Sequence, residues 1–149
     1  MVGLFIDMFC FPLGTADVID SFFHTISWNL EQKNRGSRFP VIMRELYDGE
    51  VPLEHMEEAA EEIKIIRREL ERLPRSFGVW VYQFRTDPPP RDFWENKNAP
   101  NLSKVFLTES GGDMLDDFEA AIKFAIFHRF GLKLEPIVGE MVDLDEIFS

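Results

Sequence analysis

The sequence contains little cysteine and little histidine, and each shortage excludes a type of site. Cys10 is the only cysteine among 149 residues, so the chain cannot form a disulfide within itself. A chain without disulfides suits a reducing compartment, and we expect the protein to be cytoplasmic. The three histidines, His24, His55 and His128, are scattered along the sequence rather than clustered as metal ligands are. We therefore expect neither a metal site nor a cofactor.

Positive charge is also scarce. The chain has 16 basic residues against 27 acidic ones, which gives a net charge of −11 at pH 7. A surface of this sign repels a phosphate backbone, so we do not expect the protein to bind nucleic acid. A basic protein partner would be complementary to it.

Long apolar runs and catalytic motifs are missing as well. No apolar run approaches the ~18 residues needed to cross a bilayer, so we expect no membrane segment. The apolar N-terminus, VGLFIDMFCF, has no basic region and carries Asp7, and we expect no signal peptide. The chain has no GxSxG motif, phosphate-binding loop or dinucleotide fingerprint. Nothing brings a nucleophile, a base and an oxyanion site together, so we do not expect an enzyme.

What the sequence has is a large apolar content organised around one helix. Hydrophobic residues form 45% of the chain and include 15 phenylalanines, enough to build the core of one domain. From Asp113 to Phe130 the apolar residues recur at helical spacing, in a stripe of Leu115, Phe118, Ile122 and Ile126. Ser110, three residues before Asp113, predicts a capping-box-like start, and Gly131 predicts the end.

The remaining elements predict the fold class. We expect a strand at 2–11, central in its sheet because both its faces are apolar, with Leu4 and Ile6 on one face and Phe9 and Phe11 on the other. Helices are expected at 15–32, capped by Thr15, and at 40–48 and 53–73. Further strands are expected at 77–84, at 104–108 and, as an edge strand, at 132–136. The expected fold is a single α+β domain over residues 1–149. It has about four mostly antiparallel strands with helices packed mainly on one face, in the order strand-helix-helix-helix-strand-strand-helix-strand.

Two segments are strongly acidic. The helix expected at 53–73 has five glutamates in its first half and arginines in its second, which complements the helix dipole and indicates a solvated face. Residues 136–149 mix apolar side chains with four carboxylates and contain no basic residue. This tail is either docked or a flexible partner-binding segment, and its many apolar side chains favour docking.

The loop after the strand at 77–84 is the best candidate for binding a partner. It starts with three prolines and places two aromatic residues among charges. Carboxylates beside a large aromatic side chain provide both electrostatic steering and a desolvated anchor, so we expect binding by Asp87, Asp92, Trp94 and Glu95. The alternative is that Phe93 and Trp94 only pin the loop to the core, and the sequence leaves both interpretations open.

Two further surfaces support other functions. Phe124 and Phe127 project away from the apolar stripe of their helix, so they could carry self-association or pack against the tail. The turn from Thr108 to Asp113, TESGGD, precedes a helix whose first amides could bind an anion, although nearby aspartates favour a simple capped turn. A small-molecule enzyme or sensor using this turn, and a self-associating structural protein, are therefore the alternatives to a binding protein.

Four stretches, VGLFIDMFCFPLGT, SFFHTIS, GSRFPVIMRELYDGEV and NLSKVFLTESGGDML, occur in this order along the chain. Together they resemble the immunity protein 70 family of bacterial polymorphic toxin systems, over roughly residues 2–135. The proline-rich loop and the tail after Pro136 depart from the family. The resemblance implies a small cytoplasmic protein that binds a cognate toxin and blocks it without chemistry. Toxin class does not follow from the family, but the acidity of this chain favours a basic toxin.

Overall fold

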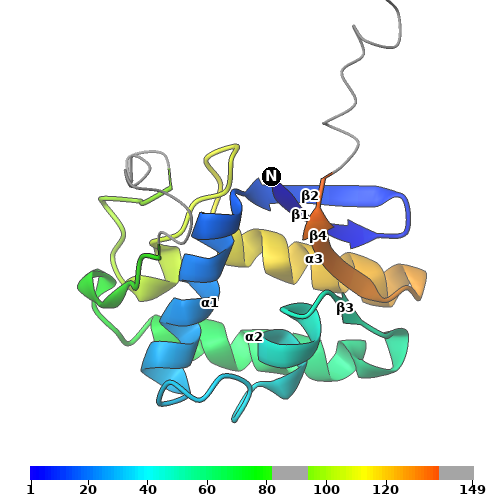
Figure 1. Ribbon diagram of the computed structural model, residues 1–149, viewed down its shortest axis with the longest axis horizontal. Helices are drawn as coiled ribbons and strands as arrows, with labels where there is room; N and C mark the ends of the chain where they lie inside the picture. Colours follow the sequence, from blue (N-terminus) through cyan, green and yellow to red (C-terminus); the bar gives the residue numbers. More distant parts are fainter. Residues whose placement is uncertain (82–93, 138–149) are drawn as a thin grey trace, which may run out of the picture.

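A four-stranded antiparallel sheet forms one part of the molecule (Figure 1). The structure is a computed structural model that describes residues 1–81 and 94–137. The strands are β1 (Val2–Ile6), β2 (Phe9–Gly14), β3 (Glu50–Val51) and β4 (Leu132–Pro136), in the spatial order β2-β1-β4-β3. The predicted α+β class with about four antiparallel strands is confirmed, although the strands are not all the expected ones.

The predicted strand at 2–11 is wrong as a single element, because the chain turns back at Asp7 and Met8. Asp7 has a φ of 52°, a left-handed conformation that Asp adopts more readily than most residues. The reversal pairs Leu4 with Phe11 and Ile6 with Phe9, so these four side chains share one face of the sheet. The alternation along a single strand had placed Phe9 and Phe11 on the opposite face.

Strand β4 lies at its predicted position but is not an edge strand. It pairs with β1 on one side and with the two-residue β3 on the other. Strand β3 is too short to leave an alternating pattern in the sequence, which is why the second neighbour of β4 was not expected.

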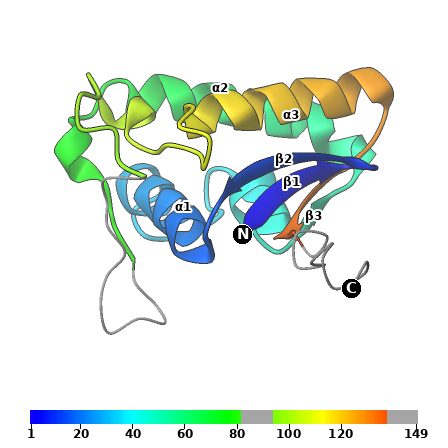
Figure 2. The same cartoon turned by 90° about the horizontal axis from the view of Figure 1, so that it is seen from above.

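Three helices pack with this sheet, as Figure 2 shows from above. They are α1 (Ala16–Leu30), α2 (Met56–Leu70) and α3 (Met114–His128). Helices α2 and α3 lie side by side as one layer, and the sheet and α1 lie together on the other side of the core (Figure 2). Thr15 caps α1 as predicted, because its hydroxyl accepts a hydrogen bond from the amide of Val18. The helix expected at 40–48 is a short π-helix, Val41–Leu46.

Two predicted strands are not strands of the sheet. At 78–81 the backbone amides of Val79 and Val81 donate to the hydroxyls of Thr25 and Ser21 on α1, at 2.8 Å each. Residues 82–84 lie outside the described residues. The segment predicted as a strand at 104–108 begins in a 3-10 turn, Leu102–Lys104, and then forms only isolated bridges. In both segments, contacts with distant parts of the chain outweigh the β-propensity of the residues.

The core is built around the helix that the sequence placed at the centre. Phe118 of α3 is fully buried, with its ring 5.0 Å from Phe22 and 6.2 Å from Phe23, both of α1. Helix α3 ends earlier than expected, at His128, and Arg129 takes the left-handed conformation that Gly131 was expected to provide. Residues 138–149 of the tail lie outside the described residues.

Candidate protein-binding surfaces

The predicted binding loop is described only from Trp94 onward, since Asp87 and Asp92 lie outside the described residues. Trp94 and Glu95 run antiparallel to residues 105–107, and the carbonyl of Trp94 accepts the amide of Leu107 at 2.9 Å. The half-buried Trp94 ring packs over Gly14, where an added Cβ would lie 3.2 Å from it. Trp94 therefore anchors the loop to the core, and Glu95 is half-buried beside it.

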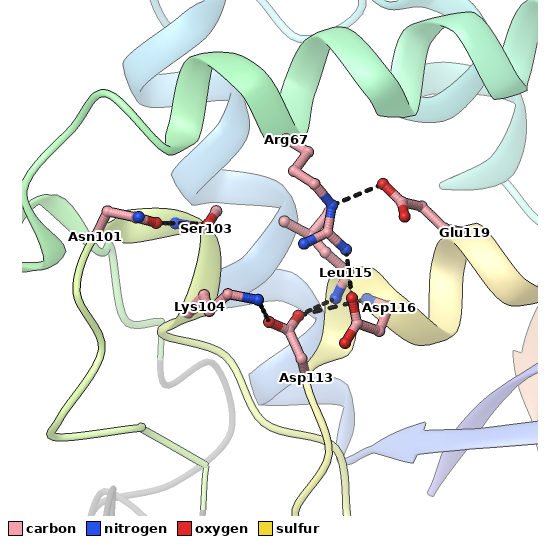
Figure 3. A network of polar contacts seen from close by, with 8 residues as sticks. All are labelled: Arg67, Asn101, Ser103, Lys104, Asp113, Leu115, Asp116 and Glu119. Atoms are coloured by element: carbon pink, nitrogen blue, oxygen red, sulfur yellow. Dashed lines mark hydrogen bonds and ion pairs between the residues drawn. The ribbon is translucent and has the colours of Figure 1, made fainter.

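The turn from Thr108 to Asp113 is closed by its own side chains. The Thr108 hydroxyl accepts the amide of Gly112, and Asp113, not Ser110, caps α3. The Asp113 carboxylate accepts the amide of Leu115 at 2.9 Å and contacts Lys104 at 3.2 Å (Figure 3). An anion bound at these amides would have to displace Asp113, because the carboxylate already occupies the helix N-terminus.

Beside this turn, one arginine joins α2 to α3. Arg67 of α2 donates from Nε to Glu119 and from Nη2 to Asp116, both at 2.7 Å, and both acceptors lie on α3 (Figure 3). The Arg67 side chain is mostly buried, so this fork fixes the register of α2 against α3. Its role is structural.

The acidic face of α2 is only partly the solvated surface that the sequence predicted. Glu54, Glu57, Glu58 and Glu61 are exposed, but Glu62 is half-buried and accepts the amides of Val41 and Ile42 at the start of the π-helix. Burial raises the pKa of Glu62 above its usual 4.5, and the two amide hydrogen bonds only partly oppose it. One carboxylate of the face thus supports the fold.

This pKa shift predicts a pH dependence for the Glu62→Gln variant. Because the folded-state pKa is raised, the contribution of Glu62 is fully present below its unfolded pKa near 4.5 and is lost as the pH rises through the folded value. The free energy of unfolding of the wild type minus that of Glu62→Gln should therefore fall as the pH rises from 4.5. Urea unfolding followed by circular dichroism measures this difference.

Glu69 provides the matched control with the opposite sign. Its hydrogen bonds with Arg38 lower its pKa, so its contribution is present above 4.5 and is lost on acidification. The difference between the wild type and Glu69→Gln should shrink as the pH falls below 4.5. Profiles that slope in the same direction for the two variants would contradict one of the assignments, and flat profiles would contradict both.

Exposed apolar side chains gather at one end of the molecule. The β1–β2 turn and the C-terminal end of α3 lie together, at the right of Figure 1. Met8 is 89% exposed, Phe9 58% and Phe127 82%, and Phe130 is also exposed. The ring of Phe124 lies 5.0 Å from Phe9 and 4.2 Å from His128, which in turn lies 4.9 Å from Phe127. We call the set Met8, Phe9, Phe124, Phe127 and His128 the aromatic end.

A hollow of about 280 Å³ lies on the outer face of the sheet, away from α3, and the chain links it to the aromatic end, since Asp7 precedes Met8 and Phe130 follows His128 by two residues. Phe5 and Phe130 supply its apolar lining. Its charged lining consists of Asp7, Glu50 and Glu135 with Lys133. The hollow therefore combines aromatic surface with three carboxylates and one ammonium group.

Comparison with known proteins decides the family. The family model described as immunity protein 70 matches residues 4–134. The chain belongs to this family. No curated protein and no solved structure matches the chain. The expected resemblance is confirmed over nearly the same residues.

No helix in the described ranges is long and apolar enough to span a membrane. Residues 1–81 and 94–137 contain no group of three or more side chains arranged to hold a metal ion.

The sequence predicted only part of the aromatic end. Phe124 and Phe127 were identified, but Phe9 and Met8 were assigned to the interior of a strand. The only signal for the turn is Asp7, a poor strand former in the middle of an apolar run. Phe124, expected either to carry self-association or to pack against the tail, packs against Phe9 and Phe11 of the hairpin.

Proposed function

We propose that this protein binds a cognate bacterial toxin and neutralises it stoichiometrically, without a reaction of its own. The observation that carries the proposal is membership of the immunity protein 70 family over residues 4–134. Cytoplasmic action against the toxin is part of the proposal, because a chain with a single cysteine forms no disulfide within itself and suits a reducing compartment.

The charge of the chain supports a basic toxin. A net charge of −11 repels acidic proteins and attracts basic ones, which speeds encounter and favours a complementary interface. Of the residues first expected to contact the toxin, Glu95 is half-buried, and Trp94 already packs on the core.

The leading alternative is a small-molecule enzyme or sensor at the Thr108–Asp113 turn. The hydrogen bonds within this turn disfavour it. The amides that would hold an anionic ligand are occupied by the Asp113 carboxylate. The hydroxyl of Thr108 is also engaged within the turn. A ligand would gain little from groups that are already paired.

Co-expression with the toxin domain encoded beside this gene tests the proposal. The wild-type protein should restore growth, and the purified pair should form a complex of one copy each in titration calorimetry. An unrelated toxin domain expressed at the same level is the control and should stay toxic. Continued toxicity of the cognate domain, with the protein present in soluble form, would refute the proposal.

A further inference from the structure

We infer that a basic surface of the toxin docks on the aromatic end and the adjoining hollow, with a cationic side chain entering the hollow. The inference rests on the proposed function and names the surface and the chemistry of its partner. The inferred contact lies at the turn of the β1–β2 hairpin, whereas Trp94 packs over Gly14 at the other end of the same hairpin.

The distribution of apolar surface is the first argument. Seven large apolar side chains are exposed among the described residues. Three of them, Met8, Phe9 and Phe127, belong to the aromatic end, and a fourth, Phe130, lines the hollow. Contiguous exposed apolar patches mark interaction sites far more often than scattered single residues do. Aromatic side chains held by their neighbours also lose little conformational entropy on binding, so they make good anchors.

The hollow supplies the charge complementarity. Its three carboxylates exceed its single ammonium group, so it favours a positive ligand. Phe5 and Phe130 offer apolar surface to the methylene stem of a lysine or arginine, and a ring face attracts the cationic head. Glu50 and Lys133 are cross-strand partners in the sheet, which leaves Asp7 and Glu135 as the carboxylates most available to the incoming cation.

A second copy of this chain fits the hollow less well than a basic toxin does. Two copies meeting through this end would bring their carboxylates together while each carries a net charge of −11. Like charges brought together in an interface cost binding energy, and the single Lys133 in each hollow cannot offset them. The toxin is therefore the occupant we infer.

The other exposed aromatic side chains, Trp28 and Phe77, are less suited to bind a cationic partner. Lys33 lies 3.9 Å over the ring of Trp28 and covers it with positive charge. Phe77 is 47% exposed in a 3-10 turn, with no other exposed large apolar residue on its own element. On α2, Glu61 contacts Lys64, and the neighbouring carboxylates Glu57 and Glu58 have no exposed aromatic group beside them. Phe77 and Glu57 therefore serve as matched controls.

The test measures toxin affinity and association rate for paired variants. Phe127→Glu should raise the dissociation constant at least about 30-fold, the loss typical of a hot-spot anchor, while Phe77→Glu should stay within about threefold. Glu135→Lys should slow association and reduce its salt dependence more than Glu57→Lys does. Phe127→Ala repeats the apolar test without a new charge, and circular dichroism checks that each variant folds.

The outcomes separate the two proposals. Normal toxin binding by Phe127→Glu, Phe127→Ala and Glu135→Lys, with the wild type also binding, would overturn this inference and leave the proposed function intact. No binding by the wild type would refute the proposed function and this inference with it. If light scattering showed that Phe127→Glu converts a dimer to a monomer with unchanged toxin affinity, the aromatic end would be a self-association surface and the inference would be wrong.

Discussion

Replacing Glu31 with alanine is expected to lower the free energy of unfolding by about 3–5 kcal/mol. The Glu31 side chain follows α1 and is only 2% exposed. One carboxylate oxygen accepts the amide of Gly36 at 3.0 Å, and the other accepts the amides of Arg38 and Phe39 at 3.1 Å each. Alanine would leave three amides without their acceptor. Those of Gly36 and Phe39 belong to buried residues, where each unpaired donor costs about 1–3 kcal/mol.

The glutamine variant sharpens this prediction. Glutamine has nearly the same shape, but either orientation turns its NH2 group toward at least one of the three amides, so a donor faces a donor. Glu31→Gln should therefore also be destabilised, although less than Glu31→Ala. The exposed Glu71 is the control, because Glu71→Ala should change the free energy of unfolding by no more than about 0.5 kcal/mol.

Urea unfolding followed by tryptophan fluorescence and circular dichroism measures all three variants. A Glu31→Ala protein as stable as Glu71→Ala would mean that water or a repacked loop replaces the carboxylate. The prediction would then be wrong. Glu31 follows α1 and precedes the segment that leads into the π-helix. Its replacement should therefore destabilise α1 and residues 36–46 together.

Features set by local sequence were predictable. The apolar stripe of α3 and the Thr15 cap of α1 depend on residues within one or two helical turns, and the structure has both. The cap of α3 was placed at Ser110 rather than at Asp113, because Ser and Asp are both good caps and only the path of the turn selects between them.

Features set by distant contacts were not predictable. The amides of Val79 and Val81 find acceptors on α1 instead of on a strand, and nothing near them in the sequence indicates this choice. The hollow likewise combines Asp7, Glu50 and Glu135 from three separate strands or turns. Aromatic residues beside carboxylates were expected in the loop after the strand at 77–84, whereas the hollow combines them at residues that only the topology of the sheet brings together.

Gly131→Ala is expected to lower the free energy of unfolding by about 3 kcal/mol, because the new methyl group would collide with backbone. A Cβ at residue 131 would lie 2.5 Å from the carbonyl oxygen of Val51 in β3 and 3.4 Å from the amide nitrogen of Leu53. Both atoms belong to the backbone and not to a flexible side chain. The collision can therefore be avoided only if β3 moves away from β4. The glycine expected to end a helix is instead required by this close approach.

Gly112→Ala is the matched control, since its added Cβ would lie 3.4 Å from the Thr108 hydroxyl and 4.0 Å from the Ser110 hydroxyl, both ordinary contacts. Thermal and urea unfolding should show Gly112→Ala close to the wild type and Gly131→Ala clearly destabilised. Gly131 and Glu50 also line the hollow on the outer face of the sheet. A displaced β3 would therefore weaken toxin binding in the folded Gly131→Ala protein as well, and full stability of this variant would show that β3 can shift at little cost.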